Sequence, residues 1–192
     1  MKLIAAAGIS WSGDWALITA ASVAVYRETD STAAVSLLLA LAAIPAVLLA
    51  PIAGAVADRH DRRKVMFTAD LASGLVLLAT LPALGSAAEL PAMYAAVLAL
   101  GIFSTFQRPA SEALLPALAP PAQLSRANSG LKLAQRLGTI GGAAAGAWLI
   151  DRRGIETVFV VDAVTFFLSS AIIAAIPAVR LSAAEAAEST FR

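Results

Sequence analysis

Long apolar stretches separated by short polar connections run through the whole chain. A helix needs about 20 mostly apolar residues to cross the hydrocarbon core of a bilayer, at about 1.5 Å rise per residue. The windows that reach this length are Leu3–Tyr26, Ala34–Ala57, Val65–Gly85, Leu90–Leu118, Leu131–Ile150 and Val158–Val179. The fifth begins with Lys132, Gln135 and Arg136, but such side chains can snorkel to the interface from a helix end. The pattern therefore predicts an all-α, polytopic membrane protein with six transmembrane helices.

The composition supports lipid as the solvent of this chain. Hydrophobic residues make up 59% of the 192 residues and charged residues 14%, whereas a soluble domain is about half apolar and a quarter charged. Lys2 followed by Leu3–Ala7 faintly resembles the start of a signal peptide, but the apolar run continues to Tyr26 without a strong cleavage context. We expect residues 1–180 to form a transmembrane bundle, and residues 181–192 to be a polar tail or the start of a linker.

The placement of basic residues predicts the orientation of the chain. An N-terminus in the cytoplasm puts ten of the 14 basic residues on the cytoplasmic side, namely Lys2, Arg59, Arg62, Arg63, Lys64, Arg126, Lys132, Arg136, Arg180 and Arg192. Arg27, Arg152 and Arg153 then lie outside, and Arg108 falls inside a span. Because cytoplasmic loops carry an excess of lysine and arginine, this orientation is favoured. Both termini are expected in the cytoplasm.

Several classes of function lack the residues that they require. The chain has no cysteine, and its single histidine, His60, lies in a charged loop, so we expect no metal site and no cofactor. No basic face interleaved with aromatic residues is present, which leaves nucleic-acid binding without support. The Gly13-Asp14 and Ala69-Asp70 pairs lack the motifs of an intramembrane aspartyl protease, and a membrane serine protease would need a buried histidine. An enzyme is therefore not expected.

The chain resembles itself at an offset of 92 residues. Ala53-Gly54-Ala55 recurs as Ala145-Gly146-Ala147, and the Phe67-x-x-Asp70 pattern recurs as Phe159-x-x-Asp162. An offset that spans three helices places the second copy upside down relative to the first. Inverted three-helix repeats are a building principle of secondary transporters, although an alanine-rich chain can also produce such matches by chance. We interpret the chain as two inverted three-helix repeats.

A charged loop between the second and third spans carries the most specific motif, which runs from Gly54 to Lys64 as GAVADRHDRRK. We expect Gly54 to let a neighbouring helix approach closely. Asp58 can accept hydrogen bonds from the N-terminus of a facing helix, and Arg62 can pair with a carboxylate on a neighbouring helix. The simpler alternative is a loop that only fixes the topology.

This loop resembles the signature loop of the major facilitator superfamily of transporters. Gly54, Asp58, Arg59, Arg62 and Arg63 match that signature, while Asp61 stands where most members have glycine. The aspartate at this position resembles the branch that contains macrolide efflux proteins and the enterobactin exporter. Other stretches that resemble this branch are Gly13-Asp14, Phe106–Pro116 and Ala127-Asn128. The resemblance implies the N-terminal six-helix half of a bacterial transporter in the cell membrane. It also implies that Glu112 pairs with Arg62 in a charge relay that reports on the closed state.

Two ionisable residues inside the spans are the candidates for proton coupling. Asp14 lies about 16 Å from Leu3 along its helix, near mid-bilayer, where an ionisable residue is costly unless it faces a cavity or a partner. A carboxyl at this depth suits the binding and release of a proton, but a helix-packing hydrogen bond explains it equally well. Arg108 is a possible counter-charge or a snorkelling arginine, and Pro109 should kink its span. For Asp70 and Asp162 we favour capping or interhelical hydrogen bonds.

The fifth span is rich in glycine, with Gly138, Gly141, Gly142 and Gly146. Small residues at this spacing let membrane helices pack closely. The pattern is similar to a glycine-rich antiporter motif of the family, but the proline of that motif is absent because Ile140 precedes Gly141. Trp11, Trp15 and Trp148 either line a cavity, lie in the interfacial belt or pack against other helices.

The function that this sequence favours is proton-driven export of a small, rather apolar compound by alternating access between two bundles. The expected partners are the lipid bilayer, the substrate, protons and a second six-helix half, because one six-helix bundle cannot enclose a pathway alone. The chain is therefore expected to be a fragment, a split half or a subunit that pairs. The alternative is a non-transporting membrane scaffold or assembly subunit.

Overall fold

The computed structural model describes residues 2–176, which form six long helices joined by short connections. These helices are α1 (Lys2–Thr29), α2 (Thr32–Arg59), α3 (Arg62–Thr80), α4 (Glu89–Leu118), α5 (Leu124–Arg153) and α6 (Ile155–Ala174). Two single turns of 3₁₀-helix, Leu81–Ala83 and Pro121–Gln123, follow α3 and precede α5. The prediction of an all-α chain with six long helices is confirmed. The polar tail predicted at residues 181–192 lies outside the described residues.

The helix ends differ from the apolar windows because polar residues also take part in the terminal turns. Asp61 is the N-cap of α3, and its side chain accepts a hydrogen bond of 3.0 Å from the backbone N–H of Arg63. At the other end, α3 stops at Thr80, because Pro82 offers no backbone N–H to continue the helix. The third predicted span, Val65–Gly85, is therefore shorter as an α-helix.

The fifth helix begins seven residues before the predicted span, at Leu124 rather than Leu131. Apolarity alone assigned Arg126 and Asn128 to a connection, yet both lie in the first turns of α5. By length and composition, five of the described helices are long and apolar enough to cross a membrane. The described helix that is not apolar enough is α5. It is nevertheless as long as α4, and it packs along α1.

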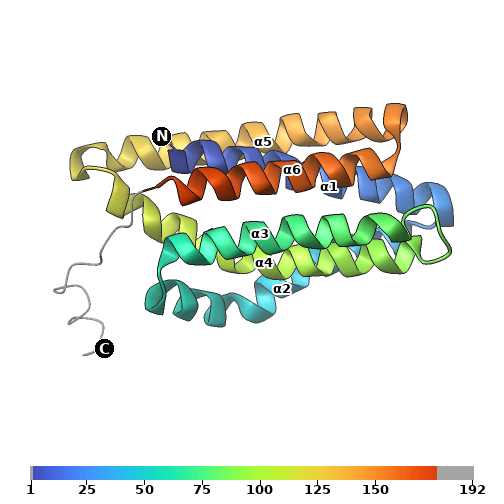
Figure 1. Cartoon of the computed structure of the whole chain (residues 1–192), viewed down its shortest axis with the longest axis horizontal. Helices are drawn as coiled ribbons and strands as arrows, with labels where there is room; N and C mark the ends of the chain where they lie inside the picture. Colours follow the sequence, from blue (N-terminus) through green and yellow to red (C-terminus); the bar gives the residue numbers. More distant parts are fainter. Residues whose placement is uncertain (1, 177–192) are drawn as a thin grey trace.

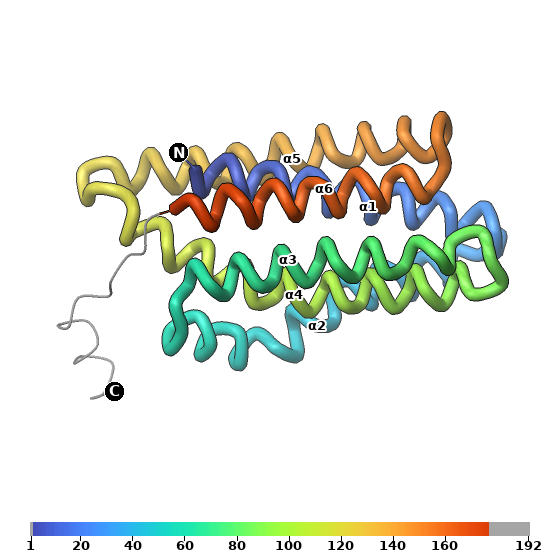
Figure 2. The backbone as a smooth tube through the Cα atoms, viewed as in Figure 1, coloured from blue at the N-terminus to red at the C-terminus, as the bar shows by residue number. Residues whose placement is uncertain are grey.

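Successive helices run in opposite directions, so that α1 and α4 point opposite ways (Figure 1, Figure 2). The helix contacts also follow a two-fold pattern, in which α1, α2 and α3 correspond to α4, α5 and α6. The contact of α1 with α5 corresponds to that of α4 with α2, and the contact of α1 with α6 corresponds to that of α4 with α3. The packing therefore has the pairing expected of two inverted three-helix repeats.

Three glycines of α5 make its close approach to α1 possible. A Cβ at Gly142 would collide with the carbonyl oxygen of Ser12, and one at Gly146 with that of Ala16. Gly138 likewise lies against the backbone of α1, whereas a Cβ at Gly141 would meet nothing within 4 Å. Gly54 on α2 is equally open, so within the described residues it serves no close helix contact.

Two apolar clusters occupy the two ends of the bundle. One holds Leu17, Val25, Met93, Val97 and Phe159 among its members, and the other holds Leu3, Met66, Leu114 and Ile173. Along α1, α3, α4 and α6, the residues between these clusters include the exposed side chain of Arg108 and polar side chains that are wholly or partly buried, namely Ser10, Asp14, Asp70, Ser73, Thr105, Gln107 and Ser169. We call this set the polar layer. It crosses the middle of the bundle, where polar groups need partners or a function.

Candidate transport cavity

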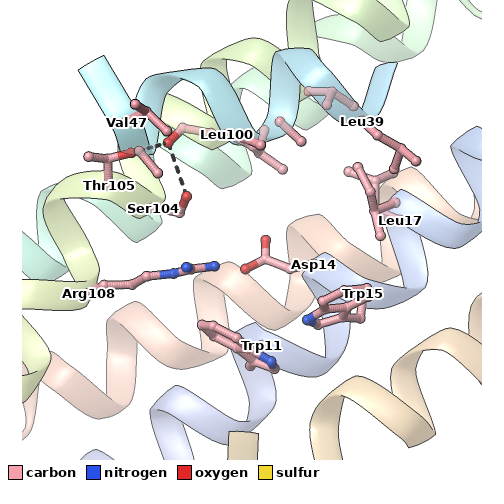
Figure 3. Close-up of a pocket in the computed structure, with 16 residues that line it drawn as sticks. Trp11, Asp14, Trp15, Leu17, Leu39, Val47, Leu100, Ser104, Thr105 and Arg108 are labelled. Carbon is pink, nitrogen blue, oxygen red and sulfur yellow. Dashed lines mark hydrogen bonds between the residues drawn. The ribbon is translucent and has the colours of Figure 1, made fainter. Parts of the chain in front are cut away.

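A cavity of about 510 Å³ opens between α1, α2 and α4. Its walls are mostly apolar, with Leu17 and Ile18 from α1, Leu39 and Val47 from α2, and Leu100 from α4 among them. Asp14, Trp11 and Trp15 come from α1, and Ser104, Thr105 and Arg108 from α4 (Figure 3). A concave, largely apolar space with a few convergent polar groups is the usual form of a small-molecule site.

Asp14 and Arg108 point toward each other from opposite walls of this cavity (Figure 3). Among residues 2–176 the ion pair that forms is Arg27 with Asp151, at 3.3 Å on the surface, so Asp14 and Arg108 face each other without direct contact. The guanidinium carbon of Arg108 lies 4.5 Å from the centre of the Trp11 ring, within the range of a cation–π interaction. Arg108 is therefore directed into the cavity rather than snorkelling away from it.

Hydrogen bonds fix the residues around this pair. The indole N–H of Trp11 donates to the Thr139 hydroxyl of α5 at 2.8 Å, which holds the ring beneath the guanidinium. The hydroxyls of Ser104 and Thr105 both donate to the Gly101 carbonyl of their own helix (Figure 3).

α4 continues as a helix through Pro109. Trp11 and Trp15 line the cavity, whereas Trp148 is an exposed residue of α5.

Asp70 ties three helices together inside the polar layer. Its carboxylate accepts hydrogen bonds from the Gln107 amide of α4 and, at 2.5 Å, from the Ser169 hydroxyl of α6. The interhelical hydrogen bonds expected of Asp70 are therefore present. Gln107 precedes Arg108 in α4, so this network also anchors the segment that directs Arg108 into the cavity.

Asp162 lies behind the cavity, in the contact between α6 and α1. It is completely buried, and its Oδ1 accepts a hydrogen bond of 3.0 Å from the Thr165 hydroxyl. A Cβ at Gly13 would collide with this carboxylate oxygen and with Thr165. Gly13 thus leaves the room that Asp162 occupies beside the backbone of α1, one residue before Asp14. The other oxygen, Oδ2, has no hydrogen-bond partner among the described residues. Asp162 therefore bonds within its own helix rather than across helices.

The signature loop contacts α4 and α6 through two arginines. Arg62 donates to the Ala113 carbonyl at 3.1 Å and to the Ala57 carbonyl at 3.4 Å. Arg63 donates to the carbonyls of Ile173 and Ala174, at 3.1 and 2.5 Å, and so covers the C-terminal end of α6. The described residues contain no ion pair between Arg62 and Glu112.

The roles expected of Asp58, Arg59 and Glu112 in conformational gating remain predictions. The signature of the loop did not reveal the N-cap role of Asp61, although an aspartate directly before a helix start is a general capping signal. Gln107 was also missed as a partner of Asp70, because amide side chains in apolar helices carry no distinctive pattern.

Comparison with known proteins agrees with this geometry. The family model described as Major Facilitator Superfamily matches residues 3–190. The uncharacterised MFS-type transporter YfiS of Bacillus subtilis (strain 168) is 33% identical over 178 residues, which cover 92% of this chain and 42% of the relative. Macrolide efflux protein A of Streptococcus pyogenes is 29% identical over 153 residues, which cover 77% of this chain and 37% of that protein.

The chain belongs to the Major Facilitator Superfamily of membrane transporters. It is a multi-pass membrane protein rather than an enzyme, and it resembles the macrolide efflux branch of the family. It spans less than half the length of the curated relatives that it matches.

Proposed function

We propose that this six-helix bundle is one half of a proton-coupled exporter of small hydrophobic compounds in a bacterial cell membrane. The observation that carries the proposal is the cavity, where Asp14 and Arg108 face each other between apolar walls. The apolar walls suit a hydrophobic substrate, and a carboxyl opposite a guanidinium provides a group whose proton binding changes the local charge. The similarity to macrolide efflux protein A supports export as the direction of transport.

The proton would act through the charge balance of the cavity. With Asp14 ionised, its charge offsets that of Arg108; with Asp14 protonated, Arg108 is left as a single positive charge on the cavity wall. Charges at this depth interact strongly because the surroundings have a low dielectric constant. Substrate and proton would therefore compete for the same cavity, as an exchange of one for the other requires.

Efflux from cells tests this function. Cells that express the chain at its native locus, and cells that lack it, are loaded with a radiolabelled macrolide or a fluorescent lipophilic dye. We expect faster efflux in the cells that express the chain, and loss of this difference when a protonophore collapses the proton gradient. Equal efflux in both cell types would favour the scaffold or assembly role.

The second half of the transporter should cover the cavity side of the bundle. α2 presents the exposed apolar side chains of Val47 and Leu48, at 77% and 69% exposure, and Val47 also lines the cavity. Because the sequence contains no cysteine, Val47→Cys gives a single reactive site. We expect this variant to form a crosslink to a second membrane segment in native membranes, while Val161→Cys on α6 serves as the control. Lipid alone around Val47 would leave both variants uncrosslinked.

The orientation follows from the positive-inside rule, because Lys2 and the Arg62–Lys64 segment lie at the same end of the bundle. We propose that this end faces the cytoplasm. His60→Cys at this end and Ala87→Cys at the opposite end place single thiols in exposed connections. A membrane-impermeant thiol reagent added to intact cells should label Ala87→Cys and spare His60→Cys. The reverse labelling would place the signature loop outside.

A further inference from the structure

The middle of the bundle holds more acid than base. Asp14, Asp70 and Asp162 are ionisable residues in the central turns of α1, α3 and α6, and Arg108 in α4 is the basic residue that lines the cavity beside Asp14. If all four were ionised, three negative charges and one positive charge would leave a net charge of −2. An unpaired charge in a poorly hydrated interior is very costly. The net negative charge must therefore be neutralised, and the three carboxyls differ in the neighbouring groups that stabilise their charge.

Asp162 has the weakest support for a negative charge. Asp14 faces the guanidinium of Arg108, and Asp70 accepts hydrogen bonds from Gln107 and Ser169. Asp162 receives a single side-chain hydrogen bond, from Thr165, and its Oδ2 is buried without a partner among the described residues. A buried carboxylate oxygen left without a donor costs the desolvation of a charged group. A proton on Oδ2 lowers this cost, because a neutral carboxylic acid is much less costly to bury than a carboxylate.

The surroundings of Asp162 fit a neutral acid. Phe159, Ala163 and Phe166, its neighbours on α6, are members of a buried apolar cluster. The charged groups that act on Asp162 from the helices packed against α6 are the carboxyls of Asp14 on α1 and Asp70 on α3. α5 has no charged residue between Arg136 and Asp151. Asp162 therefore faces two acids and no base, and both acids disfavour a further negative charge.

We propose that Asp162 is a second proton-binding residue, buried behind the cavity and electrostatically coupled to Asp14 through the gap that Gly13 leaves in α1. A role of Asp162 in transport rests on the proton coupling proposed above. Binding forms one O–H bond at Oδ2 and releases nothing else. Exchange with solvent passes by way of Asp14, which lines the cavity, so that one carboxyl loses the proton that the other gains.

Infrared spectroscopy of the purified chain in lipid nanodiscs tests the proposal without any transport assay. The carbonyl stretch of a protonated carboxyl is separate from the bands of a carboxylate, and it shifts when H₂O is replaced by D₂O. We expect one such band at neutral pH to disappear in Asp162→Asn, and to persist in Glu156→Gln, the matched control at an exposed acid of the same helix. An unchanged band in Asp162→Asn would overturn the proposal.

Three further variants test the geometry and the coupling. Thr165→Val removes the donor to Oδ1 and should shift the frequency of the Asp162 band. Gly13→Ala should shift or remove the band, whereas Gly141→Ala, where a Cβ meets nothing within 4 Å, should leave it unchanged. Asp14→Asn removes a neighbouring negative charge, so the Asp162 band should disappear at a lower pH than in the wild type. An identical pH profile in Asp14→Asn would overturn the coupling.

These spectroscopic outcomes are independent of the export proposal. An absence of efflux would contradict the export proposal without changing the infrared result. An absence of the Asp162 band would contradict proton binding at Asp162 without changing the efflux result. If Gly13→Ala does not fold, Thr165→Val still decides whether the band belongs to Asp162, because a Val side chain is close to Thr in volume.

Discussion

Arg108 of α4 lies over the indole ring of Trp11 of α1, with 4.5 Å between the guanidinium carbon and the ring centre. The ring is held from the other side by the hydrogen bond of 2.8 Å between its N–H and the hydroxyl of Thr139. A single side chain thus links α1, α4 and α5 beside the cavity. The stacking keeps the guanidinium on the cavity wall, where it faces Asp14 (Figure 3).

Substitutions of Trp11 should separate these two interactions. Trp11→Phe keeps an aromatic face for Arg108 but loses the hydrogen bond to Thr139, which contributes about 0.5–1.5 kcal/mol. Trp11→Ala loses the cation–π interaction as well, which contributes about 0.5–2 kcal/mol. We expect the midpoint of thermal unfolding in detergent to fall in the order wild type, Trp11→Phe, Trp11→Ala. Equal midpoints for the two variants would show that the ring does not hold Arg108.

The α1–α5 contact should tolerate a methyl group at some glycines of α5 and not at others. Gly142→Ala and Gly146→Ala introduce a Cβ into the backbone of Ser12 and Ala16, and overpacking of this kind costs about 1–3 kcal/mol. Gly141→Ala is the matched control, because its Cβ meets nothing within 4 Å. It should be neutral or stabilising by about 0.5–1 kcal/mol. Thermal unfolding and the yield of monodisperse protein measure both effects, and a loss in Gly141→Ala as large as in Gly142→Ala would contradict this packing.

Arg63 should stabilise the end of α6 that lies nearest the signature loop. Its guanidinium donates to the carbonyls of Ile173 and Ala174, and a cation at a helix C-terminus also interacts favourably with the helix dipole. Arg63→Ala should speed amide hydrogen exchange in the last turn of α6 by about five- to tenfold, equivalent to about 1–1.4 kcal/mol. Arg59→Ala is the control, since the structure shows no hydrogen bond of the Arg59 side chain among the described residues. Equal exchange in the two variants would remove the link between loop and helix.

The fold was largely predictable from the sequence because membrane helices must be long and apolar. The six windows found all six helices. Helix ends were less predictable, since terminal turns accept polar residues: α5 begins at Leu124, and the apolar pattern could not show that Arg126 and Asn128 are helical. The offset of 92 residues correctly indicated two repeats, although Gly54 and Gly146, which it equated, have different surroundings.

The candidate site was predictable in its charged members and not in its supporting ones. Asp14 and Arg108 stand out because ionisable residues are rare inside membrane helices. That they face the same cavity depends on the rotation of α1 against α4, which a sequence does not give. The role of Gly13 was hidden for the same reason, since only the structure shows that Asp162 fills the space above it.

The most direct test of the account replaces Asp14 with Asn in the chain at its native locus, so that every partner is present. Glu28→Gln is the matched control, because Glu28 is an exposed acid of the same helix. The measurement is the rate of macrolide or dye efflux with and without a proton gradient, at equal amounts of protein in the membrane. We expect Asp14→Asn to abolish the dependence on the gradient, whereas Glu28→Gln should keep it. Gradient-dependent efflux that is unchanged in Asp14→Asn would contradict the account.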